Sequence, residues 1–212
     1  MVASIAYPTR QKYFLKIKPM EGGGAKVSVL KDQELPVNSE YAAFEFGSYK
    51  SGCLANDGCL YYFPDEDLKV LKLDPNKGEC LSFAGEPVEN ASRIRAVRGS
   101  DDCIYGIPAV IPDKFDVLKF NPVNNCISTM SGKISEALSG RKRYRYIVGG
   151  VMAEDGNIYA ATEFGQVLKI NVVKNECSFI GRKIYSGDTF GWGSPIIGEN
   201  KCISPTCKDT VH

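Results

Sequence analysis

Carboxylates are the side chains of this sequence with the most evident potential for chemistry. They cluster at residues 65–67, 101–102 and 154–155. Carboxylates can hold a divalent cation or exchange a proton. The last two clusters, however, lie in a turn sequence that recurs along the chain. Asp is favoured in such turns because its side chain bonds to its own backbone. We therefore interpret these carboxylates as structural, and we predict no catalytic and no metal-binding residues.

Histidine is nearly absent from the chain, since His212 at the last position is the only one. A chain end is a poor place for a preorganised base. This composition excludes Ser-His-Asp and Cys-His catalysis, histidine-ligated zinc and facial-triad iron within this chain. The glycine-rich stretch 21–24 matches neither GxGxxG nor GxxxxGK[ST], so we interpret it as a flexible turn. We expect no cofactor.

The chain has eight cysteines, which could suggest disulfides or a metal site. No two of them have the CxxC spacing of a zinc site. Six fall at two recurring positions, and residues on different repeats should lie too far apart to pair. The positions hold Cys59, Cys103 and Cys202, and Cys80, Cys126 and Cys177. We therefore expect buried free thiols, which suit a reducing compartment.

Three motifs recur in a fixed order along the chain. The first is a turn followed by a strand, anchored at Tyr61, Tyr105 and Tyr159. The second reads FLKIKP, VLKLDP, VLKFNP and VLKINV, at intervals of 56, 47 and 50 residues. The third is a short strand with a cysteine at its head. Together with the apolar stretch before each turn, they make a unit of about four short strands and roughly 50 residues, which is typical of a β-propeller blade.

The strand sequences CLYYF and CIYGI are apolar on consecutive residues. This pattern indicates sheets covered on both faces, as blades are when each packs between two neighbours. We predict an all-β fold of four to five blade units within one domain, residues 1–212. The predicted blades are 1–31 (partial), 44–84, 93–131, 145–181 and 190–205 (partial). The alternative is a β-sandwich whose hairpins are similar by coincidence.

The turn and strand motif resembles the "DG-x-[I/L]-Y" motif of NHL-repeat, regucalcin/gluconolactonase-like and streptogramin-lyase-like propellers. Gly149-Gly150 followed by Tyr159 also looks loosely kelch-like. The resemblance covers residues 44–205 well and 1–31 weakly, and it implies the fold more than a function. A regucalcin-like lactonase would need acidic and amide side chains that converge on a divalent cation. No residue of this sequence can be matched to such a site.

The motifs at the two ends of the chain do not decide whether the blades form a closed ring. The C-terminal part carries the first two strands of a blade, and the N-terminal part carries the second, third and fourth. Joining them would leave one strand spare. The chain is therefore either a small four-bladed ring with a displaced strand or a segment of a larger ring. We favour the segment, whose exposed strand edges would promote association with another chain.

One cluster of basic residues lies at the end of an insertion, residues 132–144, that lengthens the interval between the third and fourth predicted blades. It comprises Arg141, Lys142, Arg143, Tyr144 and Arg145. The cluster could contact an acidic partner or phosphates, with tyrosine as a stacking surface, or it could be a solvated loop that runs into a strand. We predict these five residues as the partner-binding site.

The second motifs contribute a recurring lysine. These residues are Lys16, Lys72, Lys119 and Lys169. They could form a basic ring with one member on each blade. Alternatively, each is the solvated residue of a half-exposed strand, with its stem over apolar neighbours.

The overall charge gives no reason to expect a nucleic acid or a membrane as partner, because 26 basic residues stand against 25 acidic ones. The N-terminus lacks the features of a signal peptide, so we expect a cytoplasmic protein. We predict a non-enzymatic propeller scaffold that binds a protein partner through blade loops, and that could self-associate if the ring is incomplete. The alternative is a metal-dependent lactonase-like or lyase-like propeller enzyme.

Overall fold

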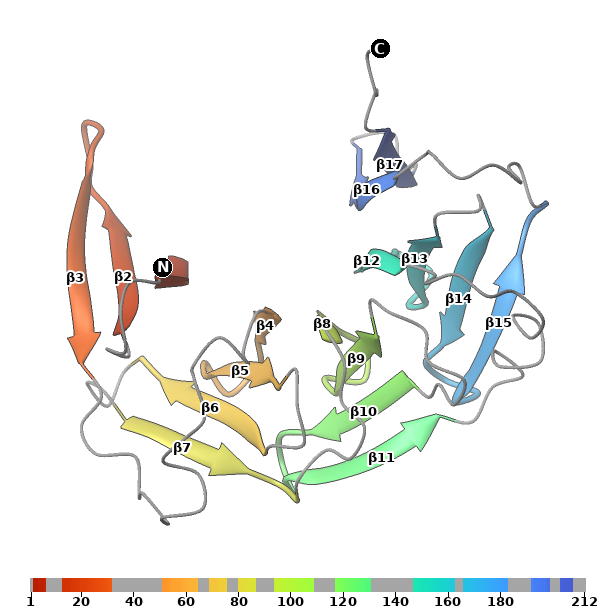
Figure 1. Ribbon diagram of the computed structural model, residues 1–212, viewed down its shortest axis with the longest axis horizontal. Helices are drawn as coiled ribbons and strands as arrows, with labels where there is room; N and C mark the ends of the chain where they lie inside the picture. The colour runs from red at the N-terminus through yellow and green to blue at the C-terminus, as the bar shows by residue number, and fades with distance from the viewer. Residues whose placement is uncertain are drawn as a thin grey trace.

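The computed structural model of the protein is an array of short β-strands (Figure 1). It describes residues 2–6, 13–31, 51–64, 69–75, 80–86, 94–108, 117–130, 147–162, 166–182, 192–198 and 203–207. Among these residues there is no helix long and apolar enough to cross a membrane.

The strands form five antiparallel sheets that follow one another along the chain. The first contains β1 (Val2–Ala6), β2 (Tyr13–Pro19) and β3 (Ala25–Lys31). The second contains β4 (Ser51–Leu54), β5 (Leu60–Phe63), β6 (Val70–Asp74) and β7 (Cys80–Ala84). The third contains β8 (Ile94–Arg98), β9 (Ile104–Pro108), β10 (Val117–Asn121) and β11 (Cys126–Met130). The fourth contains β12 (Ile147–Met152), β13 (Ile158–Thr162), β14 (Val167–Asn171) and β15 (Glu176–Ile180). The last contains β16 (Trp192–Ile197) and β17 (Ile203–Cys207).

The five sheets stand around a common axis like the blades of a propeller. In Figure 1 the strands β4, β8, β12 and β16 lie nearest the centre, while β7, β11 and β15 lie at the rim. Within each four-stranded sheet the chain runs from the innermost to the outermost strand, and each strand pairs with the next. The predicted all-β fold of propeller blades is therefore confirmed. The exact limits of the domain and its blades stay predictions.

The terminal sheets are separate from each other. The sheet β1–β3 has three strands and the sheet β16–β17 has two, and no strand pairing joins them in the described residues. Figure 1 shows them on either side of an opening in the arc. The described strands form an open arc, and whether the chain is a closed small ring or a segment of a larger one stays a prediction.

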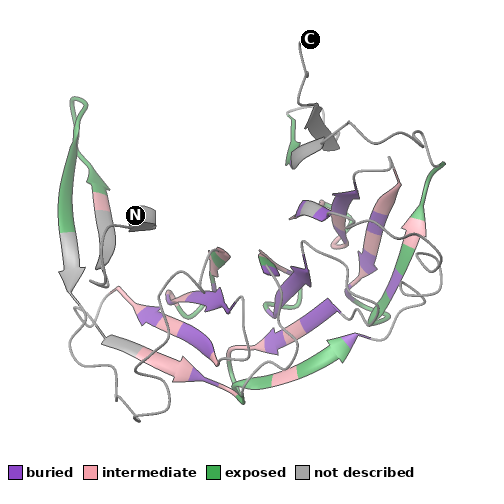
Figure 2. Ribbon diagram, viewed as in Figure 1, coloured by how far each residue is buried: buried purple, intermediate pink, exposed green. Residues whose placement is uncertain are grey.

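The core of the protein lies between consecutive blades. One apolar cluster joins the β4–β7 blade to the β8–β11 blade, with the Tyr61 and Phe120 rings 5.2 Å apart. A second cluster joins the β8–β11 blade to the β12–β15 blade through residues such as Tyr105 and Leu168. All five residues of β9 are buried, as Figure 2 shows for the middle of the arc. The prediction of strands covered on both faces is thus confirmed for the β8–β11 sheet, because it packs against a neighbour on either side.

Candidate functional site

The recurring turn of the sequence joins the first and second strands of each complete blade. We call these turns, residues 55–59, 99–103 and 153–157, the inner turns. In residues 55–59 the amide of Ala55 donates to the Cys59 carbonyl at 2.9 Å, which closes the hairpin. Gly58 has a φ of 79°, a left-handed conformation that glycine adopts without steric cost. Asp102 takes the corresponding place in the second turn, with a φ of 61°.

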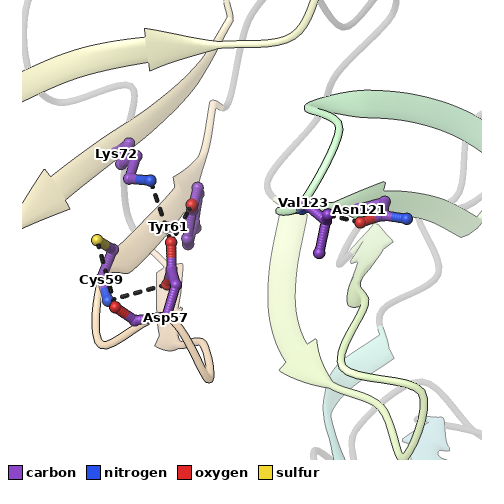
Figure 3. Close-up of polar contacts among 6 residues, drawn as sticks. All are labelled: Asp57, Cys59, Tyr61, Lys72, Asn121 and Val123. Carbon is purple, nitrogen blue, oxygen red and sulfur yellow. Dashed lines mark hydrogen bonds and ion pairs between the residues drawn. The ribbon is translucent and has the colours of Figure 1, made fainter.

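The aspartate of the first inner turn uses both of its carboxylate oxygens. Oδ1 of Asp57 accepts a hydrogen bond from the Cys59 amide at 3.0 Å. Oδ2 accepts the Tyr61 hydroxyl at 2.7 Å and the Lys72 ammonium at 3.0 Å. Figure 3 shows these three groups around the carboxylate. One side chain thus ties together the turn, the strand β5 and the strand β6.

The same arrangement recurs on the next blade. Oδ1 of Asp101 accepts from the Cys103 amide at 3.2 Å, and Oδ2 accepts the Tyr105 hydroxyl at 3.0 Å. The Lys119 ammonium forms an ion pair with Oδ2 at 2.7 Å. Strand register explains the recurrence, because each tyrosine lies directly opposite its lysine across the strand pair.

The β12–β15 blade keeps the aspartate and the tyrosine of this arrangement. Oδ2 of Asp155 accepts the Tyr159 hydroxyl at 2.7 Å and the Asn157 side-chain amide at 2.7 Å. Lys169 lies over the Tyr159 ring, with Nζ 5.6 Å from the ring centroid. The three Asp–Tyr–Lys sets are therefore variants of one structural unit.

Hydrogen bonding lowers the pKa of all three aspartates. Partial burial by itself would raise the pKa of Asp57, but hydrogen bonds from Tyr61, the Cys59 amide and Lys72 outweigh it. The pKa of Asp101 is lowered in the same way, since the bonds from Lys119 and Tyr105 exceed the effect of burial. The pKa of Asp155 falls because its carboxylate accepts bonds from Asn157 and Tyr159. These groups are held as carboxylates with their lone pairs occupied, as expected of structural residues rather than of a general acid.

Two of the recurring lysines act as partners of these aspartates. Lys72 and Lys119 are ion-paired. Both also lie over tyrosine rings, with Nζ 5.2 Å and 5.5 Å from the centroids. Our expectation that each lysine is simply solvated was therefore incomplete. The side chain of Lys16 lies outside the described residues.

Hydrogen bonds also join the inner turns of neighbouring blades to one another. The Arg98 guanidinium donates to the side-chain oxygen of Asn56 at 2.8 Å, and the Ser100 hydroxyl donates to the Gly156 carbonyl at 2.9 Å. The inner turns of three successive blades are thus connected in a row. This row gives the turn end of the arc a preorganised surface.

A second set of turns joins the last two strands of a sheet. We call residues 20–24, 122–125 and 172–175 the outer turns. In the β8–β11 and β12–β15 sheets they close the same end as the inner turns do, because successive strands run in opposite directions. Each carries an exposed apolar side chain. Val123 and Val173 are both 91% exposed, and Met20 is 54% exposed.

Each of the two valine-bearing turns is held by an asparagine that precedes it. Oδ1 of Asn121 accepts from the Val123 amide at 2.9 Å, as Figure 3 shows. Oδ1 of Asn171 accepts from the Lys174 amide at 2.9 Å. The backbone therefore presents the valines outward at fixed positions, where polar turn residues are usual.

The partner-binding residues predicted from the sequence, Arg141, Lys142, Arg143, Tyr144 and Arg145, lie outside the described residues. This site stays a prediction. The apolar outer turns were missed, although a signal was present in the valines of the turn sequences PVNN and VVKN.

The thiols differ in exposure from one position to another. Cys59, Cys103 and Cys177 are buried, as we expected, whereas the thiol of Cys126 is exposed. Burial raises the pKa of Cys103 to about 11 and that of Cys53 to about 12. Buried thiols of this kind are unreactive. In the described part of the chain, no three side chains of the His, Cys, Asp and Glu types are grouped so that they could hold a metal ion.

The sheets, their order around the axis and the packing between them define a β-propeller fold. Solved structures of propeller proteins have a fold similar to that of this chain. Virginiamycin B lyase from Staphylococcus aureus matches at a TM-score of 0.57 and 8% identity, over 95% of this chain and 67% of that one. A streptogramin B lyase matches at 0.54 and 12%, over 95% and 66%. The extracellular domain of a hybrid two-component system from B. thetaiotaomicron matches at 0.53 and 13%, over 96% and 26%.

These likenesses establish the fold alone. The chain spans about two thirds of the length of the two lyases and about a quarter of the two-component protein. The structures have NHL-like rather than kelch propellers, so they do not support the loose kelch likeness of Gly149-Gly150. No family model matches the chain, and no curated protein matches its sequence.

Proposed function

We propose that this protein is a non-enzymatic propeller that binds a protein partner on the surface formed by its outer turns. The observation that carries the proposal is the exposure of one apolar side chain in each of the three described outer turns. An exposed valine at a turn tip contributes little to the core, so its burial against a partner would be a gain in free energy.

The rigidity of this surface supports the same proposal. The inner turns are tied to their strands by the aspartate units and to one another by Arg98 and Ser100. Asparagine side chains hold the outer turns. A preorganised surface loses little conformational entropy when it binds, which favours affinity.

A matched pair of variants tests which of the two candidate sets of residues is used. One variant combines Met20→Asn, Val123→Asn and Val173→Asn, and the other replaces Arg141, Lys142, Arg143 and Arg145 with Ala. Affinity capture from an extract of the source cells would identify a partner, and its purified form would then be titrated against each variant. We expect at least about tenfold weaker binding for the turn variant. If only the basic variant lost binding, the partner would bind residues 141–145 and not the outer turns. If the wild type captured no partner, the proposal would be overturned.

The alternative function is that of a metal-dependent lactonase-like or lyase-like enzyme. It is favoured by the similarity in fold to two proteins named as lyases. Elemental analysis after equilibration with Mg²⁺, Ca²⁺ and Mn²⁺ separates the two functions. One equivalent of a tightly bound cation would favour the enzyme, and its absence would favour the binding protein.

A further inference from the structure

Two sheet faces that border the opening of the arc are partly uncovered (Figure 1). We call the face that a sheet turns to the preceding sheet its leading face, and the face that it turns to the following sheet its trailing face. We propose that the leading face of the β1–β3 sheet packs on the trailing face of the β12–β15 sheet of a second copy, so that copies of this chain associate head to tail. The inference is independent of the outer-turn surface, because it concerns different residues.

The trailing face of the β12–β15 sheet is exposed at positions that are buried in the preceding sheets. Ile180, in the fourth strand, is 40% exposed, whereas its equivalents Ala84 and Met130 are 5% and 0% exposed. Val167 lies opposite Ile180 and is half-buried, although the valines at its place in the two preceding sheets are fully buried. The strand β16 packs on the inner strands β12 and β13. Among the described residues, the last sheet has no third or fourth strand to cover β14 and β15.

The interface between the β4–β7 and β8–β11 sheets shows what covers the equivalent place. Gly85 follows the fourth strand of the β4–β7 sheet, and a Cβ atom on it would stand 2.8 Å from the Asn125 carbonyl oxygen and 3.3 Å from Cδ1 of Ile127. Both atoms belong to the hairpin of β10 and β11. Gly181 has the same place after β15 and a similar φ, 82° against 72°, but no described atom lies within 4 Å of its Cβ position. The occupant expected at Gly181 is therefore the last hairpin of another sheet.

The β2–β3 hairpin carries the matching apolar residues and leaves them exposed. Val27 has the place of Ile127 in the last strand. Each lies opposite the same residue of the recurring motif, which is Ile17 in β2 and Phe120 in β10. Val27 is 58% exposed, whereas Ile127 packs against the cluster between the blades. Ile17 is half-buried, whereas Phe120 is fully buried, with its ring 5.2 Å from that of Tyr61.

Each copy therefore has one uncovered face of each kind, and these two faces are the two sides of an interface that the chain builds elsewhere. A single copy does not join them, because Figure 1 shows the β1–β3 and β12–β15 sheets on opposite sides of the opening. A second copy can supply the missing hairpin. Burial of the exposed valine and isoleucine side chains against each other provides the gain in free energy.

One strand is spare in this contact. The strands β1 and β17 both have the sequence of a second strand, and β17 already pairs with β16. We expect β17 to keep this place and β1 to leave β2, so that β2 and β3 lie over β14 and β15. Pro205 of β17 lies opposite Pro195, and two prolines cannot exchange hydrogen bonds, so the missing N–H of Pro205 belongs to the outer edge of β17. Side-chain packing, more than strand pairing, therefore holds the contact.

The contact is heterologous, so it continues from copy to copy and does not end in a symmetric dimer. An arc that is extended in this way curls towards itself, so we expect short oligomers. Sedimentation velocity on the full chain measures them. Dimers and larger species should appear between about 10 μM and 1 mM. A wild type that stays monomeric throughout this range would overturn the inference.

Two single variants test the head-to-tail order. Val27→Asp places a charge on the leading face and Ile180→Asp places one on the trailing face. Each variant alone should associate at least about tenfold more weakly than the wild type, because every contact needs one intact face of each kind. An equimolar mixture should form a dimer and nothing larger, since the intact trailing face of one variant accepts the intact leading face of the other. A mixture that stays monomeric would contradict the order.

Val123→Asp is the matched control, because it places the same charge on an exposed valine of an outer turn. It should associate as the wild type does, and loss of its association would overturn the inference. Thermal melts of Val27→Asp and Ile180→Asp should lie close to that of the wild type, since both residues are exposed. If either melted early, Val27→Thr and Ile180→Thr, which keep the preference for a strand, would replace them in the same mixing experiment.

Discussion

The Tyr61 hydroxyl and the Asp57 carboxylate, four residues apart, lie 2.7 Å from each other across the first inner turn. Equivalent pairs occur at Tyr105 with Asp101, at 3.0 Å, and at Tyr159 with Asp155, at 2.7 Å. Because Tyr61 and Tyr105 sit at blade interfaces and their aspartates in turns, these bonds tie the turns to the packed core. The turn surface therefore depends on the same residues as the fold.

Removal of the Tyr105 hydroxyl should lower the stability of the fold without leaving a cavity in the core. We expect Tyr105→Phe to lower the free energy of unfolding by about 1 kcal/mol, because the Asp101 oxygen loses one hydrogen bond and the ring remains. Urea denaturation measures the change. Tyr105→Leu, which also removes ring packing, should cost more. Equal effects of the two substitutions would show that the hydroxyl does not contribute.

Stability should fall in acid because of the aspartate units. The pKa of Asp101 is lower in the folded protein than the value of about 3.9 typical of an unfolded chain. Its stabilising effect is therefore fully present above the unfolded pKa and is lost as the pH falls through the folded pKa. We expect Asp101→Asn to be less stable than the wild type at pH 7, and the difference to shrink between about pH 5 and pH 2.

Urea denaturation at a series of pH values measures this dependence. Asp102→Asn, which changes the neighbouring carboxylate, serves as the matched control and should leave the acid dependence close to that of the wild type. A constant difference between the wild type and Asp101→Asn at every pH would contradict the linkage.

The interface between the second and third sheets has no room at Gly106. A Cβ atom there would stand 2.8 Å from Cγ2 of Ile94 and 3.2 Å from Cε1 of Phe63. We expect Gly106→Ala to destabilise the protein by about 1–3 kcal/mol through overpacking. A thermal melt checks this. A variant as stable as the wild type would mean that the blades separate easily at this point.

The exposure of Cys126 predicts a selective reaction with thiol reagents. In the native protein Cys126 should react rapidly with a disulfide reagent, while Cys59 and Cys103 should react only after unfolding. Cys126→Ser should remove one equivalent from the fast phase, and Cys103→Ser should leave that phase unchanged. The reverse result would show that the blade interfaces open in solution.

Much of the fold could be predicted from the sequence. The repeat placed β5, β9 and β13 after the turns at Asp57, Asp101 and Asp155, and consecutive apolar residues indicated burial on both faces. These signals are local, because turn chemistry and strand patterns depend on neighbours in the chain. The structural role of the turn aspartates followed from the same reasoning.

The partners of those aspartates could not be predicted in this way. Lys72 and Lys119 come from another strand, at a separation that differs from blade to blade, and only the strand register brings them to the carboxylates. The spacing of the repeats also does not predict which turns expose apolar residues. Valine in a turn sequence can pack under a neighbouring loop or face water, and the sequence alone does not distinguish these.

The sequence by itself thus determined the repeating unit, its strands and the conformation of its turns, since these depend on residues close together in the chain. Tertiary structure decided which side chains meet across strands, that the described strands form an open arc, and that Val123 and Val173 face outward on neighbouring blades. The physical reason is that burial and ion pairing depend on the packing of whole blades against each other, and that packing exists only once the blades have assembled.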